Sequence, residues 1–203
     1  MTSAPQDPAG RGERTLVYLA RHGQTPLNQS DDLRGLVDPP LNETGQQQAQ
    51  RLGAALGDRD PVAVVASPLR RAVQTAQPVA DRAGLPVITD RCLLDRDYGP
   101  QTGISKKKVI GQWGSVDAAP GVEPASAVRD RAVRGLTGLA RRYRGHTVVV
   151  VSHDAVNQQV LAAFDPSLGD PDAILQDNGC FNTLELRGDA WAVLAVNEVP
   201  GPD

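Results

Sequence analysis

The sequence predicts an α/β fold: an open, mostly parallel sheet of about six strands with helices on both faces. Short apolar runs rich in β-branched residues recur along the chain, and segments with helical spacing of apolar residues separate most of them. Such alternation of strands and helices is typical of a parallel sheet. The last two runs flank the turn Arg187-Gly188-Asp189, which predicts an antiparallel hairpin. A chain of 203 residues is long enough to bury the core of one domain.

Composition and charge indicate an ordinary globular protein and exclude some classes of partner. Hydrophobic residues make up 40% of the chain and charged residues 22%, and the net charge is −3 with the arginines scattered. Without a basic stripe, neither nucleic acid nor a membrane is an expected partner. Cys92 and Cys180 lack the spacing of metal ligands, so a reducing compartment is expected.

The predicted organisation is a disordered tail over residues 1–14 and a single domain over residues 15–203. The tail lacks the continuous apolar segment of a signal peptide, and no apolar run reaches the length of a membrane span. We therefore expect a cytoplasmic protein. The sequence predicts no particular oligomeric state.

The first predicted unit is strand, helix, strand. Thr15–Ala20 is short, apolar and β-prone, which predicts a buried strand. After a long polar loop that ends at Pro40, Asn42 is a good N-cap for a helix with one apolar face that ends near Gly57. Val62–Ala66 then predicts a second buried strand, parallel to the first.

The middle of the chain predicts a helix, a short strand and an insertion. Ser67 and Pro68 are expected to cap and open the helix, which Pro78 should kink or interrupt. Val87–Thr89 predicts a third strand. Residues 99–122 are the least regular segment, rich in Gly and Pro, and predict a short cap inserted into the domain.

The last third predicts two helices and three strands. The helices are expected over Pro124–Tyr143 and Ala155–Phe164, and the strands over Thr147–Ser152, Phe181–Leu186 and Trp191–Val196.

Polar residues follow the carboxyl ends of several predicted strands, where ligands bind in open α/β sheets. They are Arg21 and His22, Ser67 to Arg71, Asp95, and His153. An arginine, a histidine and a glycine at a strand end supply a phosphate clamp, a nucleophile and close approach for a ligand. A lone histidine at a strand end is more often structural, but this constellation favours phosphoryl transfer.

With these residues, the chain resembles the histidine phosphatase superfamily, specifically its phosphoglycerate-mutase-like branch. The resemblance covers residues 15–197. The matching stretches are RHGQT at 21–25 with Asn28, GLVDPPLNETG at 35–45, SPLRRAVQTA at 67–76, LDRDYG at 94–99, VVVSHDAVN at 149–157 and, as a weaker signal, Gly121 to Glu123 with Arg131.

The resemblance implies that His22 is the phosphate-accepting nucleophile and that Arg21, Arg71 and His153 complete the phosphate pocket. His22 must be neutral to attack, and we expect its other ring nitrogen to donate to a backbone carbonyl. The implied activity is a metal-independent phosphomonoesterase with a phosphohistidine intermediate, acting without a cofactor or metal on a small phosphorylated metabolite. Arg70 should point away, because successive helix positions differ by about 100°.

Two departures from the family pattern concern the proton donor. Asp95 stands where many members place a glutamate, and Asp154 stands where many have glycine after the second histidine. The His-Asp pair also resembles the donor arrangement of the acid-phosphatase and phytase branch. We favour Asp95 as the acid and keep Asp154 as the alternative.

Several other polar residues have two interpretations. Thr25 and Asn28 either bind substrate or cap turns. The run Lys106 to Lys108 is either a solvated face or supplies one lysine to an anionic substrate. His146 lies before its strand, at the opposite end of the sheet, and is expected to be structural.

Two other activities fit the same pocket. A cofactor-dependent phosphoglycerate mutase would need a longer, cation-rich cap to retain its intermediate, so the short segment 99–122 favours a phosphatase. A non-catalytic binder of phosphorylated ligands would have lost Arg21, His22, Arg71 or His153, and all four are present.

Overall fold

The structure, a computed structural model, describes residues 14–30 and 32–201. A six-stranded sheet forms its centre, with the strand order β3-β2-β4-β1-β5-β6. The strands are β1 (Arg14–Arg21), β2 (Pro61–Ala66), β3 (Val87–Thr89), β4 (Thr147–Ser152), β5 (Phe181–Arg187) and β6 (Ala190–Glu198). The first four are parallel, and β5 and β6 are antiparallel. The predicted mostly parallel sheet and its closing hairpin are confirmed.

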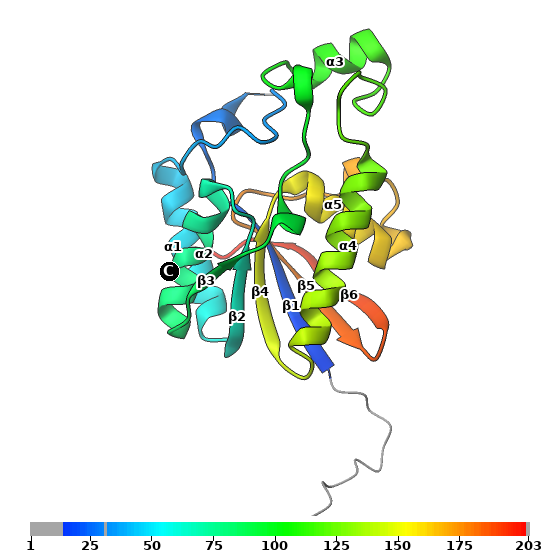
Figure 1. The fold of residues 1–203 in the computed structure, drawn as a ribbon. Helices are drawn as coiled ribbons and strands as arrows, with labels where there is room; N and C mark the ends of the chain where they lie inside the picture. Colours follow the sequence, from blue (N-terminus) through cyan, green and yellow to red (C-terminus); the bar gives the residue numbers. More distant parts are fainter. Residues whose placement is uncertain (1–13, 31, 202–203) are drawn as a thin grey trace, which may run out of the picture.

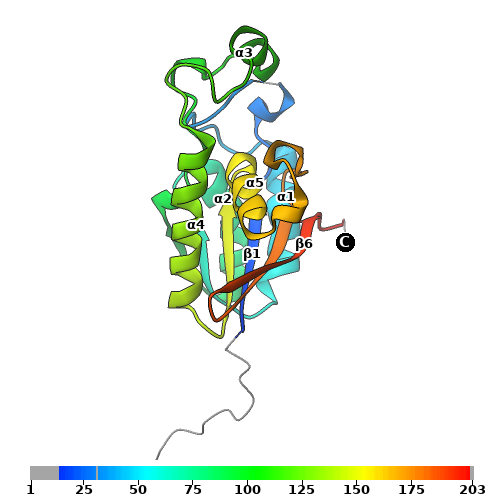
Figure 2. The same cartoon turned by 90° about the vertical axis from the view of Figure 1, so that its right-hand side faces the viewer.

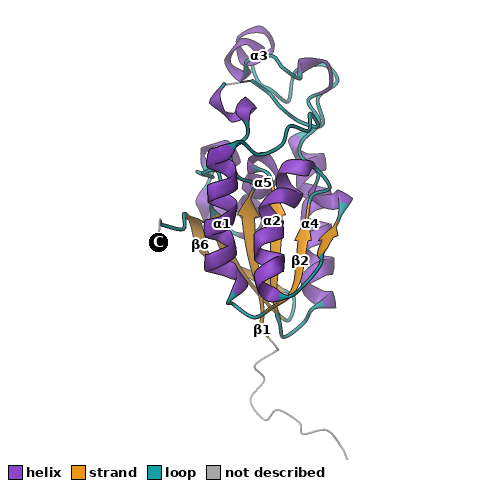
Figure 3. Cartoon of the chain, turned by 90° about the vertical axis from the view of Figure 1, so that its left-hand side faces the viewer, coloured by secondary structure: helices purple, strands orange, loops and turns teal. Residues whose placement is uncertain are grey.

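Helices cover both faces of this sheet, as predicted. The helices α4 (Ala125–Arg142) and α5 (Asp154–Phe164) lie on one face (Figure 2), and α1 (Glu43–Gly57) and α2 (Arg70–Ala83) on the other (Figure 3). Alternation along β1 sends Val17 and Leu19 into the first core and Tyr18 and Ala20 into the second. No helix in the described part of the chain is long and apolar enough to cross a membrane.

The start of α2 differs from the prediction. The N-cap is Leu69, and the helix begins at Arg70 instead of directly after Ser67. The Ser67 hydroxyl instead lies 2.8 Å from Nε2 of His153. The hydroxyl also accepts from the N–H of Leu69, at 3.4 Å, which lies before the helix. The predicted cap is therefore wrong, because Ser67 contacts His153 and the N-cap residue instead of an N–H of the helix.

Of the two predicted effects of Pro78, a kink or an interruption of α2, the interruption is wrong, since the helix continues through Pro78 to Ala83. Pro78 packs against Gly53 of α1, where an added Cβ would lie 2.8 Å from the proline Cβ. Close packing of the two helices at this glycine offsets the cost of the proline.

The segment 99–122 is more regular than predicted. It contains the helix α3 (Lys106–Trp113), at the end of the molecule to which the parallel strands point (Figure 1). A small core of its own includes Leu33, Val109 and Val116. Backbone hydrogen bonds from Leu33 to Ile104 and from Gly103 to Leu33, of 3.0 and 2.8 Å, tie it to the loop that follows β1. We call residues 26–40 and 99–122 together the cap layer.

Most of the predicted tail, residues 1–13, lies outside the described residues. Arg14, the last residue of that prediction, is the first residue of β1.

Candidate active site

The two histidines meet because β1 and β4 are adjacent and parallel. Arg21 pairs with Ser152 at the ends of these strands, so His22 and His153 are the next residues on each side. The ring centroids lie 5.2 Å apart. Both side chains are buried, although sequence separates them by more than half of the chain.

The His22 ring is fixed through both nitrogens. Nδ1 lies 2.7 Å from the backbone oxygen of Gly23. Because a carbonyl oxygen only accepts, the proton is on Nδ1, as predicted, and Nε2 keeps a lone pair. Arg71 Nε donates toward this Nε2 at 3.3 Å. Burial, followed by the charges of Arg71 and Arg21, lowers the pKa of His22 well below its ordinary value, which keeps the ring neutral.

Gly23 leaves no room for a side chain. An added Cβ would lie 2.5 Å from the backbone oxygen of Gly45 in α1. The Gly23 N–H donates to the hydroxyl of Thr75 in α2 at 2.9 Å. Both contacts hold the residue that follows His22 against the two helices.

Arg71 lies in the first turn of α2 and is almost completely buried, whereas Arg70 is exposed, as expected. Its NH2 donates to Asp95 Oδ2 at 2.8 Å and to the oxygen of Gly35 at 2.9 Å. NH1 donates to the oxygen of Val37 at 2.7 Å. The guanidinium is therefore held by two segments, the loop of Gly35 and Val37 and the Asp95 loop, and presents Nε to His22.

Arg21 is held from both sides. NH2 pairs with Asp154 Oδ2 at 3.1 Å, and NH1 donates to the backbone oxygen of Gln176. The Gln176 side chain in turn donates to Asn182 Oδ1 at 2.8 Å and accepts from Asn157 at 3.2 Å. No local signal marks these three amides in the sequence, because they meet only through the fold.

Two buried nitrogens of the site, Arg21 Nε and His153 Nδ1, face no acceptor in the described part of the chain, and Nδ1 is a donor when Nε2 accepts from the Ser67 hydroxyl. His153 Nδ1 lies 3.6 Å from Asp95 Oδ2, beyond hydrogen-bond distance. Burial, followed by the charge of Arg71, lowers the pKa of His153 well below its ordinary value. An oxyanion beside both groups would satisfy them, since buried polar groups are rarely left unpaired.

The two predicted carboxylates differ in environment. Burial, followed by the charge of Asp154, raises the pKa of Asp95 to about 6 despite its contact with Arg71. Burial also opposes ionisation of Asp154, but Arg21 and Arg34 outweigh it and hold the pKa of Asp154 well below its ordinary range. Arg34 NH2 lies 3.5 Å from Asp154 Oδ2. The sequence analysis missed Arg34, which lies in a loop without a periodic pattern.

Arg131 of α4 fixes the backbone that carries Asp95. NH1 donates to the oxygens of Cys92 and Leu94 at 2.9 and 2.7 Å, and NH2 donates to the oxygen of Asp95 at 3.0 Å. Glu123 pairs with the same guanidinium at 2.8 Å. The weak signal at Gly121 to Glu123 with Arg131 thus marks a clamp on the Asp95 loop.

The predicted substrate ligands Thr25 and Asn28 contact each other. The backbone N–H and the hydroxyl of Thr25 each donate to Asn28 Oδ1 at 2.8 Å, which forms a turn cap. His146 lies before β4, and its backbone oxygen accepts from Leu16 at the far end of β1.

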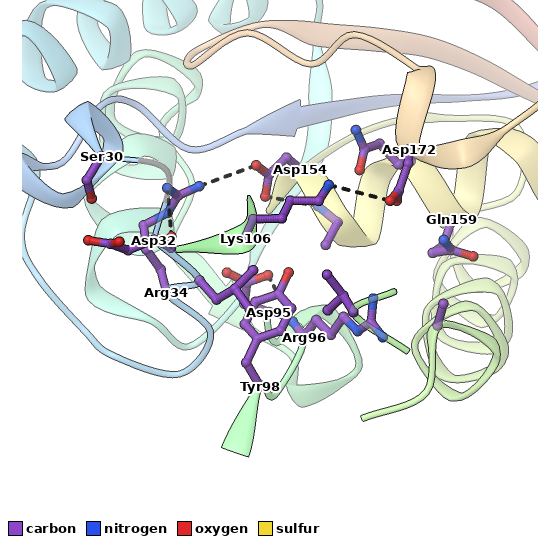
Figure 4. A pocket seen from close by; sticks show the side chains of 15 residues that line it. Ser30, Asp32, Arg34, Asp95, Arg96, Tyr98, Lys106, Asp154, Gln159 and Asp172 are labelled. Carbon is purple, nitrogen blue, oxygen red and sulfur yellow. Dashed lines mark hydrogen bonds and ion pairs between the residues drawn. The ribbon is translucent and has the colours of Figure 1, made fainter. Parts of the chain in front are cut away.

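A cavity of about 200 Å³ opens beside Asp95 and Asp154, under the cap layer (Figure 4). Its lining comes from the cap layer, the Asp95 loop, the start of α4, α5 and the loop after α5. These residues are Ser30, Asp32, Leu33, Arg34, Asp95, Arg96, Tyr98, Lys106, Val116, Ala125, Asp154, Ala155, Gln158, Gln159 and Asp172.

Comparisons with known proteins agree with this geometry. The family model of the histidine phosphatase superfamily (branch 1) matches residues 17–199. An uncharacterized phosphatase of Bacillus subtilis, PhoE, is 30% identical over 187 residues, which span 90% of this chain and 94% of that protein. A metal-independent phosphoserine phosphatase of Arabidopsis thaliana is 27% identical over 207 residues, 96% of this chain and 86% of that protein.

A solved structure has a similar fold. The mycobacterial glucosyl-3-phosphoglycerate phosphatase superposes with a TM-score of 0.81 at 25% identity, covering 91% of this chain and 99% of that one. The match of the family model over nearly the whole described chain confirms the predicted superfamily. The chain therefore belongs to the histidine phosphatase superfamily, in branch 1, and is a phosphatase of that family.

Proposed function

We propose that this protein is a metal-independent phosphomonoesterase that transfers the phosphoryl group of a small phosphorylated metabolite first to His22 and then to water. The observation that carries the proposal is the state of His22. Nδ1 is occupied by the Gly23 oxygen, and Nε2 holds a lone pair beside Arg71. A neutral, oriented imidazole next to fixed cations has the properties of a nucleophile for phosphorus.

The phosphoryl group would be held by Arg21, Arg71 and His153. The unpaired Arg21 Nε and His153 Nδ1 are donors for its oxygens. Preorganised donors in a buried site stabilise the charge that spreads over the equatorial oxygens during transfer. Because the protein's own cations supply this charge, we infer that no metal takes part.

The reaction would proceed in two steps. The Nε2 lone pair of His22 attacks phosphorus, the ester P–O bond breaks, and the leaving oxygen takes the proton of Asp95. Water then attacks phosphohistidine and gives its proton to the Asp95 carboxylate, which releases inorganic phosphate and restores both residues. Asp95 suits the acid role because its pKa, raised to about 6, lies close to neutral pH, so its carboxyl group can both give up a proton and take one back.

Asp154 is the weaker candidate for the acid. Its carboxylate pairs with Arg21 and Arg34 at 3.1 and 3.5 Å, which favours the ionised form. We infer that it orients Arg21 and raises the pKa of Asp95.

The test is His22→Ala, assayed on a phosphomonoester with and without a chelator. We expect the variant to lose more than about 100-fold in kcat, since a covalent step is lost, and the chelator to change nothing. An alkaline quench during turnover should trap phosphohistidine on the unaltered protein only. The matched control is His146→Ala, because His146 is exposed and precedes β4.

Retention of more than about one hundredth of the rate in His22→Ala would show that His22 is not the nucleophile. Interconversion of phosphoglycerates that depends on added bisphosphate and outpaces phosphate release would assign the protein as a mutase. Phosphate binding without turnover would identify a non-catalytic binder.

A further inference from the structure

We propose that the cavity beside Asp95 selects an uncharged, hydroxyl-bearing leaving group, such as a polyol or sugar, over a leaving group that carries a carboxylate. This inference rests on the proposed function, because it takes Asp95 as the acid that protonates the leaving oxygen. We call this space, lined as described above, the leaving-group cavity.

The position of the cavity assigns it to the leaving group. Asp95 and Asp154 lie in its wall, whereas Arg21, Arg71 and both histidines are absent from its lining. The phosphate-binding groups are thus on one side of Asp95 and the cavity on the other. At about 200 Å³, it is smaller than the roughly 300–1,000 Å³ of pockets for drug-sized ligands, which favours a small metabolite.

Each cation in the lining already has an anionic partner. Arg34 NH2 lies 3.5 Å from Asp154, and Lys106 Nζ lies 3.4 Å from Asp172 across the cavity (Figure 4). Arg96 pairs with Asp117, and its Nε also donates to the oxygen of Glu123 at 2.8 Å. A carboxylate on the substrate would have to displace one of these partners.

The lining also carries an acceptor, the Asp32 carboxylate, that has no partner among the described residues. Through its carboxylate, Asp32 makes no hydrogen bond or ion pair with any residue in the described ranges 14–30 and 32–201. Even when Asp95 carries the proton that it needs to act as the acid, the carboxylates Asp32, Asp154 and Asp172 balance the three cations that line the cavity, and ionised Asp95 makes the lining net negative. An added negative charge therefore meets no net attraction there, whereas a hydroxyl can donate to a carboxylate and accept from an amide.

Amide and phenol groups complete this polar lining. Gln158 donates through Nε2 to the oxygen of Ile174 at 2.9 Å, which leaves its carbonyl oxygen as an acceptor. Gln159 and Tyr98 also line the cavity. Burial and, to a smaller extent, the charge of Asp95 raise the pKa of Tyr98. The phenol therefore stays neutral and can donate a hydrogen bond. Such groups recognise hydroxyls in specific positions.

The experiment compares substrates that share a carbon skeleton and differ in one group. Glycerol 3-phosphate has a hydroxymethyl group where 3-phosphoglycerate has a carboxylate, and sorbitol 6-phosphate and 6-phosphogluconate form a second such pair. We expect kcat/KM to be about tenfold or more higher for the hydroxylated member of at least one pair. In neither pair should the hydroxylated member have the lower kcat/KM. p-Nitrophenyl phosphate, which has an aryl leaving group, reports the phosphatase chemistry itself.

A variant then tests the charge argument. Asp172→Asn removes the partner of Lys106, so kcat/KM for 3-phosphoglycerate relative to glycerol 3-phosphate should rise about fivefold or more. The matched control is Asp189→Asn, which removes an exposed carboxylate paired with Arg141 at 2.8 Å in the turn between β5 and β6. It should leave this ratio unchanged.

The outcomes separate the two proposals. Failure to hydrolyse p-nitrophenyl phosphate overturns the proposed function. If that ester is hydrolysed, an equal or higher kcat/KM for the carboxylated members overturns the inference about the cavity. Failure to hydrolyse either hydroxylated substrate also overturns this inference. So does an unchanged ratio of kcat/KM between 3-phosphoglycerate and glycerol 3-phosphate in Asp172→Asn.

Discussion

At the scale of single residues, the site contains two aspartates, Asp95 and Asp154, whose surroundings shift their pKa values in opposite directions. Asp95 is 5% exposed and faces Asp154, and its pKa is raised to about 6. Asp154 pairs with two arginines, which lower its pKa. Two carboxyl groups with pKa values moved in opposite directions can take different roles in one reaction.

Exchanging each aspartate separately tests this assignment. Asp95→Asn should reduce kcat on an alkyl phosphate by about 10²-fold or more and affect an aryl phosphate far less, because an aryloxide leaves without a proton. For the unaltered protein, kcat/KM on the alkyl ester should fall as the pH rises through about 6, because Asp95 loses its proton there. The lowered pKa of His22 keeps the nucleophile neutral over the same range.

In Asp95→Asn, the fall in kcat/KM with rising pH should disappear. The matched variant Asp154→Asn should keep this fall, with its midpoint moved to lower pH, because a negative charge that raises the pKa of Asp95 is gone. A selective defect on alkyl phosphates in Asp154→Asn, with none in Asp95→Asn, would assign the acid to Asp154.

At the scale of elements, the contact between α1 and α2 supports the residue that follows His22. Gly23 is held by Thr75 of α2 and leaves no space next to Gly45 of α1. The two helices approach closely at Gly53, where Pro78 fills the gap. The position of Gly23 therefore depends on the close approach of Gly45 and on the hydroxyl of Thr75.

A pair of glycine substitutions tests the packing of α1 and α2. Gly53→Ala places a Cβ 2.8 Å from the Cβ of Pro78, so we expect a loss of about 1–3 kcal/mol in the free energy of unfolding. Gly138→Ala in α4 meets nothing within 4 Å and should gain about 0.5–1 kcal/mol, because alanine is the better helix former. Denaturant titrations followed by circular dichroism measure both. Equal effects of the two changes would refute close packing at Gly53.

At the scale of the whole molecule, the groups that we propose to bind phosphate come from three separate segments that the sheet order brings together. The ends of β1 and β4 carry Arg21 with His22, and His153, and the start of α2 carries Arg71. A bound oxyanion would connect these segments in the folded protein alone.

Orthovanadate or tungstate should therefore raise the melting temperature. At 100 times Kd, a ligand that binds only the folded state adds about 2.7 kcal/mol to the free energy of unfolding. Arg71→Gln should remove this shift, whereas its exposed neighbour Arg70→Gln should retain it. Thermal unfolding with chloride at the same ionic strength is the control. A shift of equal size in Arg71→Gln would place the anion elsewhere.

Local sequence determined the strands and most of the helices, because their signals are short in range. Thr147–Ser152 is a continuous β-branched and apolar run, and Asn42 caps α1 by accepting from the Gly45 N–H, as expected. The places where the prediction fails involve contacts with distant residues. His153 takes the hydroxyl of Ser67, Gly53 accommodates Pro78, and the short helix α3 depends on Leu33 from another loop.

The same division applies to the site. Strand ends in a parallel sheet point to one edge, so the sequence alone could place Arg21, His22, Asp95 and His153 near one another. Only the tertiary structure determined which nitrogen of His22 carries the proton, which aspartate has a raised pKa and which cations of the leaving-group cavity are paired. These properties depend on burial and on distances between atoms far apart in the chain, because the energy of a charge is set by its neighbours in space.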